Sequence, residues 1–157
     1  MQPNPHLPAG YTVSDADLDT LARTLFGEAR GEAEPGHIGV IHVILNRLRL
    51  PGWWSRHGND GIPDDTIAAV CRHPFQFSCW NRTDPNRAKM DALSRTDPLY
   101  IRLRTLAEGV ITGNRHPDPT GGATHYKVRG WKAAWAQGKA PTAVIGKHEF
   151  YRIGPNG

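Results

Sequence analysis

The spacing of apolar residues predicts a helix near the start of the chain. Five apolar residues recur at the spacing of one helix face: Leu18, Leu21, Ala22, Leu25 and Phe26. This spacing predicts an amphipathic helix over residues 15 to about 30. Ser14 precedes the pattern as a natural N-cap, and Asp17 three residues later can act as its capping-box partner.

A second apolar pattern begins at Ile38, after a turn expected over residues 32–36. It is apolar on most sides, which predicts a helix at the buried centre of the domain. Asn46 and Arg47 are expected to end the polar side of this helix.

Three more helices are predicted further along. Asp64 or Asp65 can cap a short helix, and Asp-Pro pairs at positions 84 and 97 give N-cap plus first-turn proline signals for helices near 85–94 and 98–112. The loop expected over 51–63 contains Trp53 and Trp54, which would either stack on a sugar or cover the edge of the core.

The pattern changes after Gly113. Residues 123–128 alternate as a strand does, and a turn at Gly146-Lys147 separates two extended arms. Trp131 and Trp135, four residues apart, suggest one short helical turn. The fold class is therefore α+β, predominantly helical, with a small antiparallel β ribbon near the C-terminus. We expect an extended arm over residues 1–13 and a single domain over 14–157.

Composition adds constraints on partners. The 157 residues carry a net charge of +4, which favours an anionic partner. The basic residues are scattered along the sequence, so no nucleic-acid face is expected. The longest apolar run, 38–45, is interrupted by Gly39 and His42, so no membrane-spanning segment is expected. Cys71 and Cys79 are interpreted as two partly buried thiols rather than a disulfide.

Glu28 is the leading candidate for a catalytic residue. It falls beside the apolar stripe of the first helix, with a glycine directly before it and another three residues after it. A carboxyl group half-buried at a helix end is expected to have a raised pKa, as a general acid needs. The alternative is a structural salt bridge from Glu28 or Glu32 to Arg30 or Arg47.

Five segments in order resemble the conserved blocks of one family. They are residues 25–32 (LFGEARGE), 43–47 (VILNR), 76–80 (QFSCW), 118–126 (DPTGGATHY) and 145–151 (IGKHEFY). Together they are similar to the SleB/CwlJ cell wall hydrolases, the spore cortex-lytic group. The resemblance implies a lysozyme-like, lytic-transglycosylase-type domain that acts on the β-1,4 glycan of peptidoglycan, with Glu28 as the acid.

The same resemblance marks further residues for substrate binding. These candidates are Gln76, Phe77, Ser78, Trp80, Asn81, Thr124, His125, Tyr126 and His148. Glu32, expected one turn from Glu28 on the same helix, is badly placed to straddle a sugar with it and is given a structural role, capping or pairing with Arg47. A single acid would then form a 1,6-anhydro sugar with the substrate's own C6 hydroxyl, and we expect no cofactor and no metal.

Two alternatives remain open from the sequence. A zinc amidase could use His125 and His148 as ligands and Glu28 as base, with a third ligand from His37, His42 or Asp118. A non-enzymatic wall-binding module would explain the basic charge and the aromatic residues.

Two departures from the spore enzymes suggest how the protein is delivered. Residues 1–10 show no signal-peptide pattern, and no separate wall-binding domain is visible. Together with the insertion at 53–63, these features suit a bacteriophage endolysin or a particle-borne lysin. We expect a monomer that is made in the host cytoplasm and meets peptidoglycan after release by a holin or carriage in a particle, without stable membrane insertion.

Overall fold

The structure is a computed structural model that describes residues 4–29, 31–50, 65–73, 77–113 and 116–153. The predicted loop with Trp53 and Trp54 lies outside the described residues, and so does Gln76. Within the described part, no helix is long and apolar enough to cross a membrane.

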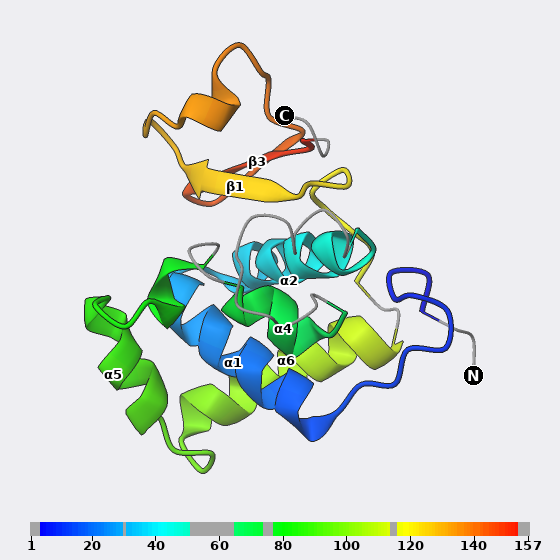
Figure 1. The fold of residues 1–157 in the computed structure, drawn as a ribbon, viewed down its shortest axis with the longest axis vertical. Helices are drawn as coiled ribbons and strands as arrows, with labels where there is room; N and C mark the ends of the chain where they lie inside the picture. Colours follow the sequence, from blue (N-terminus) through cyan, green and yellow to red (C-terminus); the bar gives the residue numbers. More distant parts are fainter. Residues whose placement is uncertain (1–3, 30, 51–64, 74–76, 114–115, 154–157) are drawn as a thin grey trace.

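Helices form one body and a small sheet lies against it (Figure 1). The helical elements are α1 (Asp15–Ala29), α2 (Glu34–Leu48), α4 (Ile67–Arg72), η1 (Ser78–Trp80), α5 (Pro85–Ala92) and α6 (Pro98–Gly113). The C-terminal elements are β1 (His125–Val128), η2 (Ala134–Ala136), β2 (Ala143–Ile145) and β3 (His148–Tyr151). This arrangement confirms the predominantly helical α+β class.

The capping box at the start of α1 forms as predicted. The Ser14 hydroxyl accepts a hydrogen bond from the Asp17 backbone N–H at 3.1 Å, and the Asp17 carboxylate accepts one from the Ser14 N–H at 3.2 Å. Asp17 also accepts hydrogen bonds from the Tyr11 hydroxyl at 2.7 Å and the Ala68 N–H at 3.0 Å. This buried carboxylate therefore ties the N-terminal segment and α4 to α1.

The N-terminal arm is folded rather than extended, which corrects the prediction. Hydrogen bonds from the Leu7 N–H to the Asn4 carbonyl and from the Tyr11 N–H to the Pro8 carbonyl, each 3.1 Å long, close two turns. Leu7 and Tyr11 pack against the main core. The apolar side chains of the arm gain burial only by folding back onto the helices.

The start of α2 was predicted four residues too late. The helix begins at Glu34 because Pro35 occupies its first turn, where a missing N–H costs nothing. The prediction that α2 is the buried centre is confirmed, since only Ile38 is more than marginally exposed between Gly36 and Leu48.

Two further local predictions were wrong. Asn46 and Arg47 do not face solvent; they are buried where the sheet covers α2. The cap of α4 is Thr66, whose hydroxyl accepts from the Ala69 N–H at 3.0 Å, rather than Asp65. In both cases the polar side chain forms a hydrogen bond with a backbone group, and the periodicity of the sequence does not reveal such bonds.

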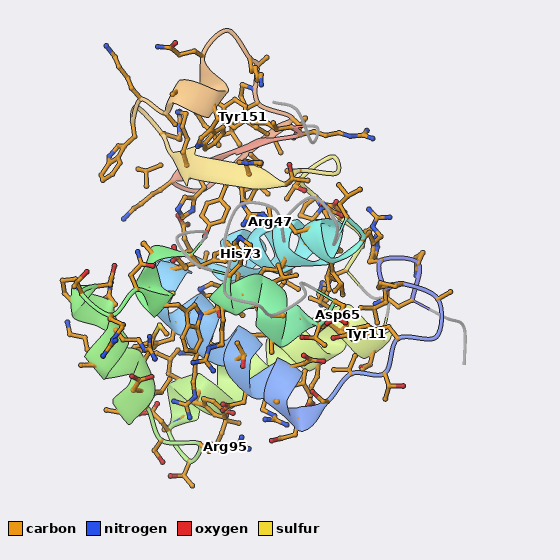
Figure 2. The ribbon with its side chains drawn as sticks, viewed as in Figure 1. Tyr11, Arg47, Asp65, His73, Arg95 and Tyr151 are labelled. Atoms are coloured by element: carbon orange, nitrogen blue, oxygen red, sulfur yellow. The ribbon has the colours of Figure 1, made fainter. Side chains whose placement is uncertain are left out.

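The sheet has strand order β1-β3-β2, with both pairs antiparallel. Because Tyr126 pairs with Phe150 and His125 pairs with Tyr151, alternate residues face opposite sides. The inner face lies on α2, and the outer face lies under η2 (Figure 1). Figure 2 shows Arg47 on the α2 side of the sheet and Tyr151 on the far side.

The short helical turn η2 contains Trp135 but not Trp131, so that prediction was half right. Trp131 follows a tight turn closed by a hydrogen bond from its N–H to the Val128 carbonyl at 3.1 Å. The side chain of Trp131 is 72% exposed.

The inner face of the sheet approaches α2 closely at a glycine. A Cβ atom on Gly39 would lie 2.8 Å from Cζ of Phe150. Phe150, Val43 and Ala123 form a small buried cluster between the sheet and α2. The absence of a side chain at Gly39 therefore sets how near the sheet can lie.

We predict opposite effects for two Gly→Ala substitutions in helices. Gly39→Ala should lower the free energy of unfolding by about 1–3 kcal/mol, because Phe150 must move. Gly109→Ala in α6, where no atom lies within 4 Å of the new Cβ, should raise it by about 1 kcal/mol through helix propensity. Urea unfolding of both variants checks this, and equal stabilisation by both would show that Phe150 does not constrain the approach.

Candidate functional site

Three elements meet at Glu28. The residue lies in the last turn of α1 and is half-buried. Its Oε1 accepts a hydrogen bond from the backbone N–H of Cys79 in η1 at 3.1 Å. Its Oε2 accepts one from the hydroxyl of Tyr126 in β1 at 3.3 Å. The carboxylate is thus oriented by one helical and one sheet donor.

A glycine makes the contact with η1 possible. A Cβ atom on Gly27 would collide with the side chain of Met90 and would lie 2.7 Å from Cβ of Cys79. The absence of a side chain at Gly27 therefore allows η1 and α5 to lie close to α1. Cys79 and Cys71 are both buried free thiols, and burial raises the pKa of Cys71 to about 12.

Tyr126 is a hydrogen-bond donor at any working pH. Burial first, and then the charge of Glu28, raises the pKa of its phenol well above the ordinary value of 10. Its ring lies edge-on to His148 at 5.2 Å and tilted against Phe150 at 5.8 Å, measured between centroids. The neutral hydroxyl is therefore held in place by packing of the Tyr126 ring against two residues of β3.

Glu32 occupies a different position from the one predicted. It lies in the turn after α1, where its N–H donates to the Ala29 carbonyl at 2.9 Å, and not on the helix itself. Its Oε1 accepts from the Lys147 N–H at 3.1 Å and lies 3.0 Å from Nδ1 of His148. The predicted pairing of Glu32 with Arg47 is therefore wrong, because its partners belong to the β2–β3 hairpin.

The pair of Glu32 and His148 is nearly enclosed, with both side chains 8% exposed. Burial lowers the pKa of His148, and the neighbouring Glu32 opposes that shift. A Cβ atom on Gly146 would collide with the Glu32 carboxylate, so the hairpin turn also closes over it. Through these contacts Glu32 connects the end of α1 to the β2–β3 hairpin.

Arg47 and Asn46 fix the segment that leads into β1. Nε of Arg47 donates to the Thr124 carbonyl at 2.8 Å, and Nδ2 of Asn46 donates to the Ala123 carbonyl at 2.8 Å. The Arg47 guanidinium also lies over the ring of Phe77, 5.0 Å from its centroid. Phe77 itself is buried, so it packs beneath the surface of the site and is not accessible to a substrate.

Two other predicted site residues from the third block make structural contacts. Trp80 donates from Nε1 to the Thr24 hydroxyl at 2.9 Å, and the guanidinium groups of Arg72 and Arg87 lie 4.8 and 5.3 Å from the centroid of its ring. Asn81 is half-buried and its N–H donates to the Ser78 carbonyl at 2.9 Å. The Ser78 side chain is exposed.

The side chains of Thr124 and His125 make structural contacts. The Thr124 hydroxyl is buried and donates to the Ile153 carbonyl at 3.1 Å. The His125 ring lies on the outer face against Trp135, with centroids 4.9 Å apart. Burial, with help from the charge of Arg47, lowers the pKa of His125 to about 3. Of the predicted binding residues, Tyr126 and His148 are the ones that the sheet brings beside the two glutamates.

The geometry contradicts the zinc amidase alternative. The β1–β3 register puts His125 and His148 on opposite faces of the sheet, so they cannot share an ion. His37 and His42 are engaged by backbone carbonyls, and Asp118 accepts hydrogen bonds from Thr120 and Asn46. In the part of the chain that the structure describes, no three metal-ligating side chains gather.

A groove of about 730 Å³ lies beyond Glu32, between the start of α2 and one side of α6. Its walls include Glu32, His37, Leu103 and Leu106. Neither Glu28 nor Tyr126 lines it. This groove is therefore separate from the Glu28 carboxylate.

Sequence reasoning missed two parts of the site. The Cys79 amide is a backbone donor, and no side-chain pattern could identify it. The contact between Glu32 and His148 joins residues more than 110 positions apart, and it depends on the hairpin register. Their nearness could have been inferred only from a correct placement of the hairpin on α1.

A profile of the cell wall hydrolase family matches residues 31–151. The spore cortex-lytic enzyme of Halalkalibacterium halodurans is 31% identical over 92% of this chain and 37% of its own length. The spore cortex-lytic enzyme of Bacillus subtilis is 28% identical over 92% of this chain and 40% of its length. The chain thus spans about two fifths of these relatives, and both alignments are long enough to include Glu28.

Two solved structures share the fold. The catalytic domain of the germination-specific lytic transglycosylase SleB from Bacillus anthracis superposes with a TM-score of 0.58 and 26% identity, over 92% of this chain and 98% of that one. The catalytic domain of the Bacillus cereus SleB protein gives 0.59 and 25%, over 93% and 95%. The profile match covers more than half of the chain, and the sequence relatives and solved structures agree with it. The chain therefore belongs to the cell wall hydrolase family, and its fold is lysozyme-like.

Proposed function

We propose that this protein is a peptidoglycan lytic transglycosylase that cleaves the β-1,4 bond between N-acetylmuramic acid and N-acetylglucosamine. The observation that carries the proposal is the Glu28 carboxylate, held at a helix end by the Cys79 amide and the Tyr126 hydroxyl. A carboxyl group oriented by fixed donors is suited to proton transfer at one defined atom.

One carboxyl group is enough for this reaction. Glu28 gives its proton to the glycosidic oxygen as the C1–O bond breaks, and the muramic ring develops positive charge. Glu28 then takes the proton from the C6 hydroxyl of the same ring while O6 bonds to C1. The product is a 1,6-anhydro sugar, and the acid is returned to its starting state. Because the nucleophile is part of the substrate, no water needs to be positioned.

The state of Glu32 supports a single-acid mechanism. Two-carboxylate glycosidases need a second free carboxylate across the scissile bond. The Glu32 side chain is nearly enclosed, accepts a hydrogen bond from the Lys147 amide and lies 3.0 Å from His148, so its carboxylate is not free in this way. Its contacts favour the structural role proposed for it.

The relatives point in the same direction. Those with curated names are spore cortex-lytic enzymes, and one solved neighbour is a lytic transglycosylase. The substrate assigned here is the peptidoglycan glycan strand. Release by a holin, carriage in a particle and a monomeric state stay predictions from the sequence.

We expect Glu28→Gln to fold normally and to lower the rate of wall lysis by at least about 100-fold, because the amide cannot donate the proton. Turbidity loss of purified sacculi measures this. Glu32→Gln is the matched control: it should keep a larger share of activity and lose thermal stability instead. Near-normal lysis by Glu28→Gln, with none by Glu32→Gln, would move the acid to Glu32.

Tyr126→Phe should lower kcat about tenfold with little change in KM, because it removes one hydrogen bond to the carboxylate while the ring still packs. Tyr151→Phe is the control, since this tyrosine donates to Glu149 on the outer face at 2.9 Å. Steady-state kinetics on soluble glycan fragments separates the two variants. Equal losses in both would show that Tyr126 does not act through Glu28.

The product of digestion should carry 1,6-anhydro-muramic ends, and exhaustive chelation should leave the rate unchanged because a carboxylic acid protonates the leaving oxygen. Mass spectrometry of digested peptidoglycan identifies the ends. Reducing muramic ends would indicate a hydrolase that uses water. Free stem peptides, with activity restored by added zinc, would indicate an amidase.

A further inference from the structure

The excess positive charge of the protein is confined to its C-terminal part. Residues 116–153 contain six Lys and Arg against two Asp and Glu, which equals the whole net charge of +4. In the remainder of the chain, 13 basic residues balance 13 acidic ones. Residues 116–153 include the whole three-stranded sheet (Figure 1), so the excess charge belongs to the unit that contains the sheet.

The outer face of the sheet carries a groove separate from the catalytic site. It has a volume of about 330 Å³, and its walls come from β1, η2, β3 and the turn between β1 and η2. Tyr151 and Lys127 form part of its lining, and Trp131 and Lys132 stand at the turn. Since Tyr126 and His148 point to the other side, the sheet itself separates this groove from Glu28.

Trp131 is exposed and follows a turn that is fixed by hydrogen bonds. It is the most exposed of the large apolar side chains in the described residues, at 72%. The turn before it is closed by the hydrogen bond from its own N–H to the Val128 carbonyl. A second bond, from the Arg129 N–H to the Lys147 carbonyl at 2.8 Å, joins it to the turn between β2 and β3. Gly130 supplies the positive φ of +83° that this turn requires. An aromatic side chain on a fixed backbone loses little conformational entropy on binding.

Charge lies beside this aromatic ring. Arg129 and Lys132 flank Trp131 in sequence, and both are exposed. Lys127 inside the groove is already paired, with Nζ 2.6 Å from Oε2 of Glu149. The cations that can meet an anionic ligand are therefore those at the turn, next to the indole.

We propose that the outer-face groove, with Trp131 and Lys132 in its wall and Arg129 in the adjoining turn, is a second binding surface for the peptidoglycan glycan strand. This inference rests on the proposed function for its ligand. A hexosamine ring stacks on the Trp131 indole, and ionised stem-peptide carboxylates pair with the two cations. A strand held here keeps the enzyme on the polymer between cleavage events, since a second attachment raises the effective concentration of the substrate at Glu28.

The test measures binding without cleavage. Each variant is made in the Glu28→Gln protein, and its Kd for sacculi stripped of teichoic acid is measured by co-sedimentation at low salt. Trp131→Ala with Lys132→Gln should raise the Kd about tenfold relative to the Glu28→Gln protein. Added salt should reduce this difference in Kd, because it screens the charge of Lys132. The control pair is Ile101→Ala with Lys89→Gln, which removes one exposed apolar side chain and one charge from the helical body. It should change Kd less than twofold.

A second readout separates this surface from the catalytic site. With Glu28 restored, the Trp131/Lys132 variant should cleave short soluble glycan fragments at the normal rate. Equal Kd values for parent and variant, an equal loss in the control pair, or a parallel loss on short fragments would each overturn the proposal. A loss seen only on sacculi that retain teichoic acid would assign the surface to a phosphate polymer instead. Soluble sugar released by the Glu28→Gln protein would contradict the catalytic role of Glu28. That result concerns the proposed function, whereas the Kd comparison tests the second binding surface.

Discussion

The geometry of the candidate site depends on how closely the sheet can approach α2. Phe150 lies over Gly39, where any side chain would hold the strand away. Tyr126 is the cross-strand partner of Phe150, so the same contact sets the height of the Tyr126 hydroxyl above the end of α1. Side-chain bonds from α2 to the carbonyls of Ala123 and Thr124 then fix the position of β1 along the helix. This packing places the Tyr126 hydroxyl 3.3 Å from Oε2 of Glu28.

The same junction separates two glutamates that are close in sequence. Glu28 lies within the final turn of α1, and Glu32 lies beyond it in the following turn. The hairpin end at Lys147 and His148 takes the Glu32 carboxylate as a partner, which joins the sheet to the helical body at a second point. Glu32 thus helps to hold the two units together, whereas Glu28, which we propose as the acid, accepts hydrogen bonds from η1 and β1.

The sequence predicts those parts of the fold that are local. Helix caps at Ser14 and Asp84, the helix stripes and the hairpin turn follow from short-range patterns, and the structure has them. The site is predicted less completely, because it is made by contacts between distant segments. The position of Glu28 follows from its helix, whereas its Cys79 donor is a backbone group. The side of the sheet on which His125 lies follows from strand register, and no pattern within either strand determines that register.

Side chains alternate between the two faces of a β-strand. This explains how one small sheet can have both proposed roles, contact with Glu28 on its inner face and glycan binding on its outer face. Odd and even positions of β1 face opposite sides, so Tyr126 can act at Glu28 while Lys127 lines the outer groove. The basic residues at the turn are in water, where salt screens their field over about 8 Å. Exposed charge of this kind attracts an extended anionic polymer, which can meet several cations at once. At Glu28 the local environment is set instead by buried neighbours, chiefly the Tyr126 phenol and the Cys79 amide. The two proposed roles, attraction to the wall and proton transfer, therefore depend on different residues of this fold, and substitutions can separate them.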